Sequence, residues 1–186
     1  MHQKLALVAV AAVLLSVTSA LSQDMPVSPD PAKTPGAVLQ TVPDERTAVC
    51  LTNLIGSSVS DGDAITLEMI CTSGYTKCIR NVSTALKKQV YASYGLQGNH
   101  TGYCESQQGC EVDHLISLEL GGANELGNLW PEPYQGEALN AHVKDQLENR
   151  LHAEVCAGRL ALKDAQKAIS TDWVAAYRKF IGEPPQ

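Results

Sequence analysis

Hydrophobic and polar residues repeat with different periods along the chain, and each period predicts a different element. The longest pattern places an apolar residue at every fourth position, which predicts a helix over about 137–156. Shorter helices are predicted over 162–169, from a Thr171 cap onward, and between a Ser83 cap and Gly95. The apolar positions of the long helix are Leu139, Val143, Leu147, Leu151 and Val155.

Between these helices the pattern predicts a β-hairpin. Residues 111–120 are the best strand candidate, and Gly121-Gly122 turns the chain. Residues 128–130 return as a second strand that Pro131 and Pro133 stop. Because short strands and helices then share one domain, the predicted fold class is α+β.

The N-terminal part of the chain predicts a leader and a linker. Residues 1–20 have a positive start, a short apolar stretch and small residues before a cleavage point, which is typical of an export signal peptide. Residues 21–46 are rich in Pro, Ser and Thr, so we expect a disordered linker. The folded domain is then expected over 47–186, beginning with short strands at 47–55 and 64–70.

The cysteines agree with export. Six follow the leader, and an even number in an exported chain favours three disulfides in a secreted or periplasmic protein. Six cysteines allow 15 pairings. We expect Cys104 to pair with Cys110 across a short polar loop, and Cys71 with Cys156. The full set is Cys50, Cys71, Cys78, Cys104, Cys110 and Cys156.

Charge is distributed unevenly. The net charge is −6, which does not favour non-specific binding to nucleic acid. Residues 69–104, however, contain no Asp or Glu. Such a segment can present a positive face to phosphates or can simply be a solvated helix surface. Its basic residues are Lys77, Arg80, Lys87 and Lys88, together with His100.

Polar residues on the long helix suggest a site. With a rotation of about 100° per residue, Asn140 lies in the middle of the apolar stripe and His142 points nearly away from it. Lys144 and Glu148 follow on the side of Asn140. A buried Asn needs a partner, and a metal ion shared with Asp113 would be one. The alternative is that Asn140 caps a helix that starts there.

Several of these pieces together resemble the HNH or ββα-metal nuclease superfamily, and more closely a group of exported HNH-type proteins. The resemblance covers about residues 69–175 and is strongest over 111–158. It implies a ββα-metal core at about 111–156, with additional helices and disulfides. The matching residues are Asp113-His114, Glu119-Leu120-Gly121-Gly122, Asn128-Leu129-Trp130, the helix positions Asn140, Lys144, Asp145 and Glu148, and upstream Cys71-Thr72-Ser73-Gly74-Tyr75-Thr76.

The resemblance implies a role for each matching residue. His114 falls on the general base, Asp113 on a metal ligand, and Asn128 on the residue that braces the loop through backbone hydrogen bonds. The last ligand position has no clean match, and Asn140 and His142 both compete for it. A related arrangement uses an Asn ligand with a Glu eight residues later, where Glu148 stands.

The expected activity is metal-dependent hydrolysis of phosphodiester bonds in DNA, with RNA as a further substrate and low sequence specificity. Two oxygen ligands with open positions suit Mg²⁺, with Mn²⁺, Ca²⁺ and Zn²⁺ as alternatives. Lys77, Arg80 and Lys144 are the expected phosphate contacts. We expect a monomer without a membrane partner, and the sequence identifies no inhibitor or immunity protein. The alternative is a non-catalytic domain of the same fold that binds nucleic acid or another anionic partner.

Overall fold

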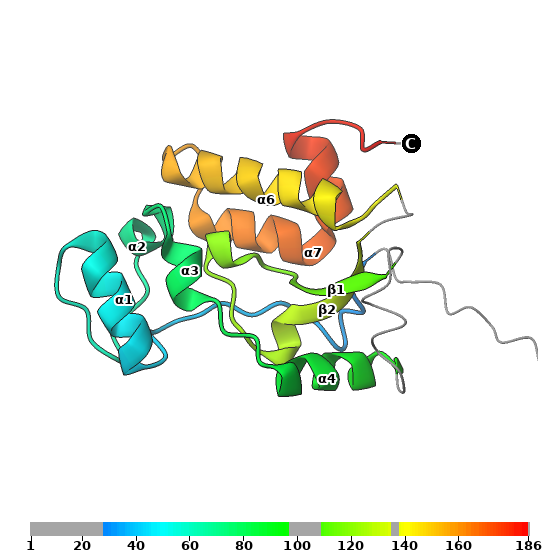
Figure 1. The fold of residues 1–186 in the computed structure, drawn as a ribbon. Helices are drawn as coiled ribbons and strands as arrows, with labels where there is room; N and C mark the ends of the chain where they lie inside the picture. Colours follow the sequence, from blue (N-terminus) through cyan, green and yellow to red (C-terminus); the bar gives the residue numbers. More distant parts are fainter. Residues whose placement is uncertain (1–27, 97–108, 135–137, 186) are drawn as a thin grey trace, which may run out of the picture.

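The computed structural model describes residues 28–96, 109–134 and 138–185 of the chain. The predicted leader lies outside these residues. The architecture is α+β: helices surround one small antiparallel hairpin of two strands, with α6 and α7 on one side and α4 on the other (Figure 1). Among the described residues, no helix is long and apolar enough to cross a membrane.

The hairpin is shorter than the sequence predicts. Strand β1 runs over Cys110–His114 and pairs with β2, Leu129–Pro133, in a register from Cys110↔Pro133 to His114↔Leu129. After His114 the chain leaves the strand, so the predicted extension to residue 120 is wrong. Pro131 lies inside β2 rather than stopping it, and Pro133 is the last residue of the strand. In a two-stranded sheet each strand has a free edge, and there a proline removes no ladder hydrogen bond.

The loop between the strands depends on its two glycines. It begins with the 3₁₀ turn η1, Leu118–Leu120, and ends with a second one, η2, Leu126–Asn128. Gly121 has a φ of +75°, which favours glycine. A Cβ on Gly122 would lie 1.7 Å from the carbonyl oxygen of Ile116, so no other residue fits there without a backbone shift.

Two long helices build the main core. Helix α6 spans Ala141–Cys156 and α7 spans Leu162–Phe180, and their apolar faces pack together with Leu120. Asp172 interrupts α7 with φ −161° and ψ 94°. Its side chain accepts a hydrogen bond from the Ala175 N–H at 2.9 Å, so Asp172 caps the second half of the helix and the predicted Thr171 cap is wrong by one residue.

The first part of the domain is helical where strands were predicted. Helix α1 spans Glu45–Ile55 and α2 spans Leu67–Cys71, so the predicted strands at 47–55 and 64–70 are wrong. The side chain of Asp44 accepts from the Thr47 N–H at 2.7 Å, a helix-starting signal that outweighs the β-branched residues. The short helix α3, Tyr75–Ile79, follows.

Helix α4, Thr84–Ser93, is confirmed as predicted. The Ser83 side chain accepts from the Leu86 N–H, and Gly95 beyond the C-terminus has a φ of +73°. The helix covers the second face of the hairpin, where Tyr91 packs with Cys110.

The predicted disordered linker is ordered over the residues that the structure describes. In this segment, Gly36 N–H donates to Gly127 O and Leu39 N–H to Gly121 O in the hairpin loop, while Val42 N–H donates to Asp63 O in the turn before α2. Val38 also forms an isolated β-bridge with Gly122. Proline and serine lower the content of buried side chains here, but the backbone still pairs with the loop. Residues 28–44 are therefore part of the domain.

Disulfides join the helices to one another. Cys71 pairs with Cys156 as predicted, which ties α2 to the end of α6, and Cys50 pairs with Cys78 between α1 and α3. Cys110 is also disulfide-bonded, and its predicted partner Cys104 lies outside the described residues. These bonds indicate a non-reducing environment.

Candidate functional site

Asp113 and His114 lie at the end of β1, on opposite faces of the hairpin. Side chains alternate along a strand, and directly paired residues share a face. The register therefore puts Asp113 beside Trp130 on one face and His114 beside Leu129 on the other. The strand ends at His114, and the register contains no bulge.

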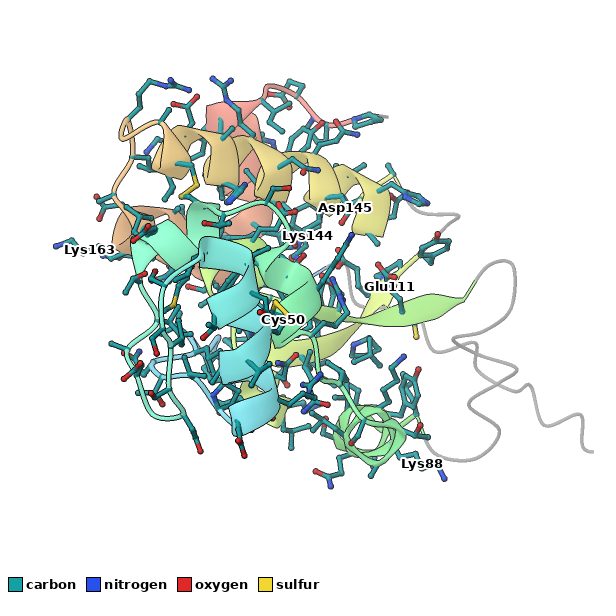
Figure 2. The ribbon with its side chains drawn as sticks, turned by 60° about the vertical axis from the view of Figure 1, so that its left-hand side comes forward. Cys50, Lys88, Glu111, Lys144, Asp145 and Lys163 are labelled. Atoms are coloured by element: carbon teal, nitrogen blue, oxygen red, sulfur yellow. A yellow bond between two sulfur atoms is a disulfide. The ribbon has the colours of Figure 1, made fainter. Side chains whose placement is uncertain are left out.

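On the first face, a buried lysine joins the hairpin to α6. The Lys144 ammonium donates to Asp113 Oδ2 at 2.6 Å, to the His114 carbonyl oxygen at 2.7 Å and to Glu148 Oε1. Its side chain is 1 % exposed. An ammonium has three N–H donors, and all three are used. Figure 2 shows Lys144 between α6 and the hairpin, with Asp145 and Glu111 nearby.

This arrangement corrects the prediction that Lys144 holds a phosphate. A phosphate contact needs a free donor at the surface, whereas Lys144 is buried and saturated by protein oxygens. Burial acts to lower the pKa of Lys144, but Asp113, Glu148 and Glu132 together hold it well above its usual value. The lysine is thus a permanent internal cation.

Burial shifts the pKa values of two of the acids around Lys144 upwards. Burial raises the pKa of Glu132 well above its usual value and that of Glu148 to about 8. Burial also acts to raise the pKa of Asp113, but Lys144 and a hydrogen bond with Glu132 bring it below its usual value. Glu132 is fully buried, and its oxygens accept no hydrogen bond from a described residue. The raised pKa of Glu132 favours a protonated carboxyl, the form that can donate to the neighbouring Asp113 carboxylate.

On the second face, His114 is held by neutral amides. It is 3 % exposed, and its Nε2 lies 3.1 Å from Oδ1 of Asn124. Burial lowers the pKa of His114, so the ring is neutral at pH 7. Asn124 was not predicted from the sequence. The signal that could have found it is its position two residues after the Gly121-Gly122 turn, where the chain returns towards the strand end.

Asn128 braces the loop through backbone hydrogen bonds, the role that the resemblance implies. Its Oδ1 accepts from Ile116 N–H at 2.9 Å and from Ala37 N–H at 3.2 Å. Its Nδ2 donates to the carbonyls of Ile116 at 2.9 Å and Ala123 at 3.0 Å. Asn128 is fully buried, and these hydrogen bonds fix the loop.

The start of α6 tests the two interpretations of Asn140, as a helix cap and as a metal ligand. Asn140 is the N-cap, and its side chain accepts from the Val143 N–H at 3.2 Å. The predicted helix start at about 137 is therefore too early. The cap fixes the amide oxygen of Asn140, the predicted metal ligand, at the start of α6. His142 is exposed, and its ring lies tilted against that of Tyr134 with centroids 4.7 Å apart, which agrees with the predicted outward direction.

A charged rim borders both faces. Burial and then Asp113 raise the pKa values of Glu111 and Asp145. Arg80 is exposed and close enough to act on the pKa values of both His114 and Asp145. Lys77 is exposed on α3. The basic residues Lys87 and Lys88 lie exposed on α4, and Figure 2 shows Lys88 at the far side of that helix.

Asp113 and Asn140, the predicted metal ligands, both offer oxygen atoms, and Lys144 binds Asp113 through Oδ2. An oxygen donor set is the kind that Mg²⁺ and Ca²⁺ prefer. Zn²⁺ fits this set less well, because it prefers nitrogen and sulfur ligands.

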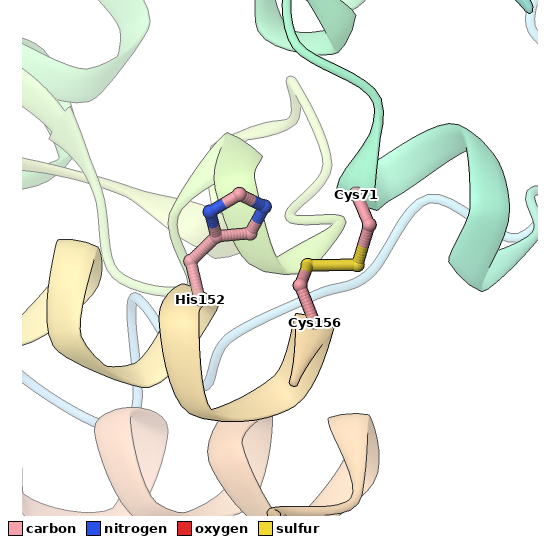
Figure 3. Close-up of side chains that lie close together, drawn as sticks. All are labelled: Cys71, His152 and Cys156. Carbon is pink, nitrogen blue, oxygen red and sulfur yellow. A yellow bond between two sulfur atoms is a disulfide. The ribbon is translucent and has the colours of Figure 1, made fainter. Parts of the chain in front are cut away.

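A second group of possible ligands lies elsewhere, at the end of α6. Donor atoms of Cys71, His152 and Cys156 lie within 4.8 Å of one another (Figure 3). The two sulfurs form a disulfide, however. The covalent bond removes both thiolates, and one histidine alone does not hold a metal ion.

Comparison with known proteins gives no assignment. No family model matches the chain, and neither a curated protein nor a solved structure matches it.

Proposed function

We propose that the chain is an exported HNH-type endonuclease that hydrolyses phosphodiester bonds, with a ββα-metal core formed by β1, β2 and α6. The observation that carries this proposal is His114: a buried, neutral imidazole held on one ring nitrogen, at a strand end next to the Asp113 carboxylate. A neutral imidazole with one free nitrogen can take a proton from an attacking water.

The Asp113 carboxylate at the end of β1 supports a divalent ion as the cofactor. Asp113 and Asn140 would hold it, with magnesium as the expected metal. When bound, such an ion supplies positive charge to the phosphate and to the leaving oxygen. Lys144 binds both the Asp113 carboxylate and the His114 carbonyl oxygen, so it holds the end of β1 in one geometry.

The positive segment supports a phosphate backbone as the substrate. Arg80 lies near His114, and Lys77, Lys87 and Lys88 lie exposed on α3 and α4. Backbone contacts of this kind carry affinity but no sequence information. We propose that the substrate is DNA, cleaved with low sequence specificity. RNA is a further proposed substrate and can be tested in the same assay.

The experiment is a plasmid cleavage assay with the oxidised mature protein. We expect nicking of supercoiled DNA with added Mg²⁺ and none with a chelator, with activity returning when metal is restored. His114→Ala should lose activity by about 10²–10⁴-fold, because it lacks the base, while metal binding stays near the wild type, and thermal unfolding checks that the variant is folded. His142→Ala is the matched control, because His142 is exposed and should tolerate the change.

One observation favours a second candidate, a non-catalytic domain that binds an anionic partner. Lys144 already pairs with Asp113, and such a cluster is stable without any metal ion. If no metal ion produces cleavage of DNA or RNA, a gel-shift titration should detect binding that falls with salt. Full activity of His114→Ala would remove the proposed mechanism.

A further inference from the structure

The side-chain amide of Asn124 has only one possible orientation. Its Nδ2 donates to the Ile79 carbonyl oxygen at 2.9 Å, and its Oδ1 accepts from the Asn81 N–H at 3.3 Å. A carbonyl oxygen only accepts and a backbone N–H only donates, so exchanging the two amide atoms would lose both bonds. These anchors do not involve His114, so they fix the amide independently of the imidazole.

The atom that Asn124 presents to His114 is therefore an oxygen. It lies 3.1 Å from Nε2. An amide oxygen can only accept, so Nε2 must carry the proton. In a neutral imidazole the other nitrogen, Nδ1, then has the lone pair.

We infer that Asn124 is the positioning residue that fixes the Nε2–H tautomer of His114 and thereby makes Nδ1 the atom that accepts the proton from water. Asn124 does not touch the reacting atoms itself. The inference rests on the proposed function for the reaction, but the tautomer is a property of the protein without substrate.

The support behind Asn124 is rigid. Ile79 is the last residue of α3 and is 1 % exposed, and the adjacent Cys78 is bonded to Cys50 on α1. The disulfide therefore restrains Ile79, whose carbonyl oxygen accepts the hydrogen bond from the Asn124 amide. On the other side, Asn128 braces the loop that carries Asn124 by donating to Ala123 O. The histidine is oriented by parts of the chain that are far apart in sequence.

The test measures the ring nitrogens of His114 by ¹⁵N NMR in the oxidised full-length mature protein, with the signal identified by its loss in His114→Gln. The wild type should show the Nε2–H form at neutral pH, with a slowly exchanging ring proton. Asn124→Leu removes the acceptor and should give a mixture of tautomers, loss of the slow ring proton and a kcat lower by about 10–100-fold at unchanged KM. Asn124→Asp keeps an acceptor and should keep the Nε2–H form.

Asn149→Leu is the matched control, because that asparagine also donates to a backbone carbonyl, Asp145 O at 2.8 Å, but is exposed on α6. It should leave the His114 signals and kcat unchanged. A wild-type Nδ1–H form, or an Asn124→Leu spectrum identical to the wild type, would overturn the inference. If Asn124→Leu does not fold, the wild-type tautomer and Asn124→Asp still decide it. Correct tautomers without any nuclease activity would overturn the proposed function and leave the assignment of Asn124 intact.

Discussion

The two faces of the hairpin hold neighbouring residues by different means. Asp113 is fixed by charge: Lys144, Glu148 and Glu132 surround it in a buried cluster. His114 is fixed by neutral groups: the amides of Asn124 and Asn128 hold the ring and its loop. Charged interactions change with pH and with bound cations, whereas amide hydrogen bonds do not. The candidate base His114 therefore lies on the face whose contacts do not change with pH or bound cations. The candidate metal ligand Asp113 lies on the face whose contacts do.

The largest effect on stability should come from removing the internal cation. Lys144→Met leaves Asp113 and its neighbouring acids without a counter-charge, and breaking a buried pair in this way costs about 3–5 kcal/mol. Urea unfolding at pH 7 measures the loss. Lys163→Met is the control, because Lys163 is exposed on α7. A loss below about 1 kcal/mol would mean that the cluster is not the main support of this face.

The neutral face should lose less stability, and the loss should not depend on pH. Asn128→Ala leaves the buried Ile116 N–H and the carbonyls that Asn128 serves without their partner, at a cost of about 3 kcal/mol. Urea unfolding at several pH values between 5 and 9 should give the same difference from the wild type. Asn53→Ala, at an exposed position of α1, is the control. A difference that varies steeply with pH would contradict the contrast between the faces.

The charged face should make stability depend on pH through Glu148. Burial raises its pKa from 4.5 to about 8, so between these values the folded protein holds a proton that the unfolded chain has released. This contribution is fully present below pH 4.5 and is lost as the pH rises through 8. The free energy of unfolding then falls by at most about 1.4 kcal/mol per pH unit.

Glu148→Gln should remove this part of the pH dependence, because glutamine keeps an acceptor for Lys144 but does not titrate. Unfolding of both proteins between pH 5 and 9 measures the difference, and Glu125→Gln at an exposed loop position is the control. Parallel curves for Glu148→Gln and the wild type would show that Glu148 is already ionised in the folded protein.

The sequence predicted what depends on local patterns. The stripe of α6 follows from its period, and the Ser83 cap and Gly95 bound α4. The pairing of Cys71 with Cys156 was also predicted. The stripe and the helix bounds are readable because neighbours along the chain determine them, whereas Cys71 and Cys156 are 85 residues apart. Residues 28–44 were misread because their backbone pairing leaves no trace in side-chain composition.

The site was predictable only in part, because its contacts join distant segments. The helical period put Lys144 on the inner side of α6, but nothing in that period shows the carboxylates of the facing strand. Glu132 looks like an exposed residue between two prolines, yet the register places it under α6. Asn124 reaches His114 only because Ile79 lies beside the loop. Residue types gave the candidate chemistry, and tertiary packing gave each residue its role.

The smallest effect should separate the two functions of Asn140, which lies where the charged face meets α6. Asn140→Ala removes the helix cap and the candidate metal ligand together, so stability should fall by about 1 kcal/mol and metal binding should weaken strongly. Asn140→Ser keeps a capping oxygen but not the amide ligand. It should recover most of the stability and none of the metal affinity. Urea unfolding and calorimetric titration with Mg²⁺ measure the two quantities separately.

His142→Ala is the matched comparison for Asn140, because His142 lies two residues further along the chain and is exposed. Metal affinity and activity should stay within a few-fold of the wild type, since an exposed substitution changes little. The reverse result, an inactive His142→Ala with an active Asn140→Ala, would place the ion on the histidine. The charged face would then end at Lys144, and Asn140 would serve only as the cap of α6.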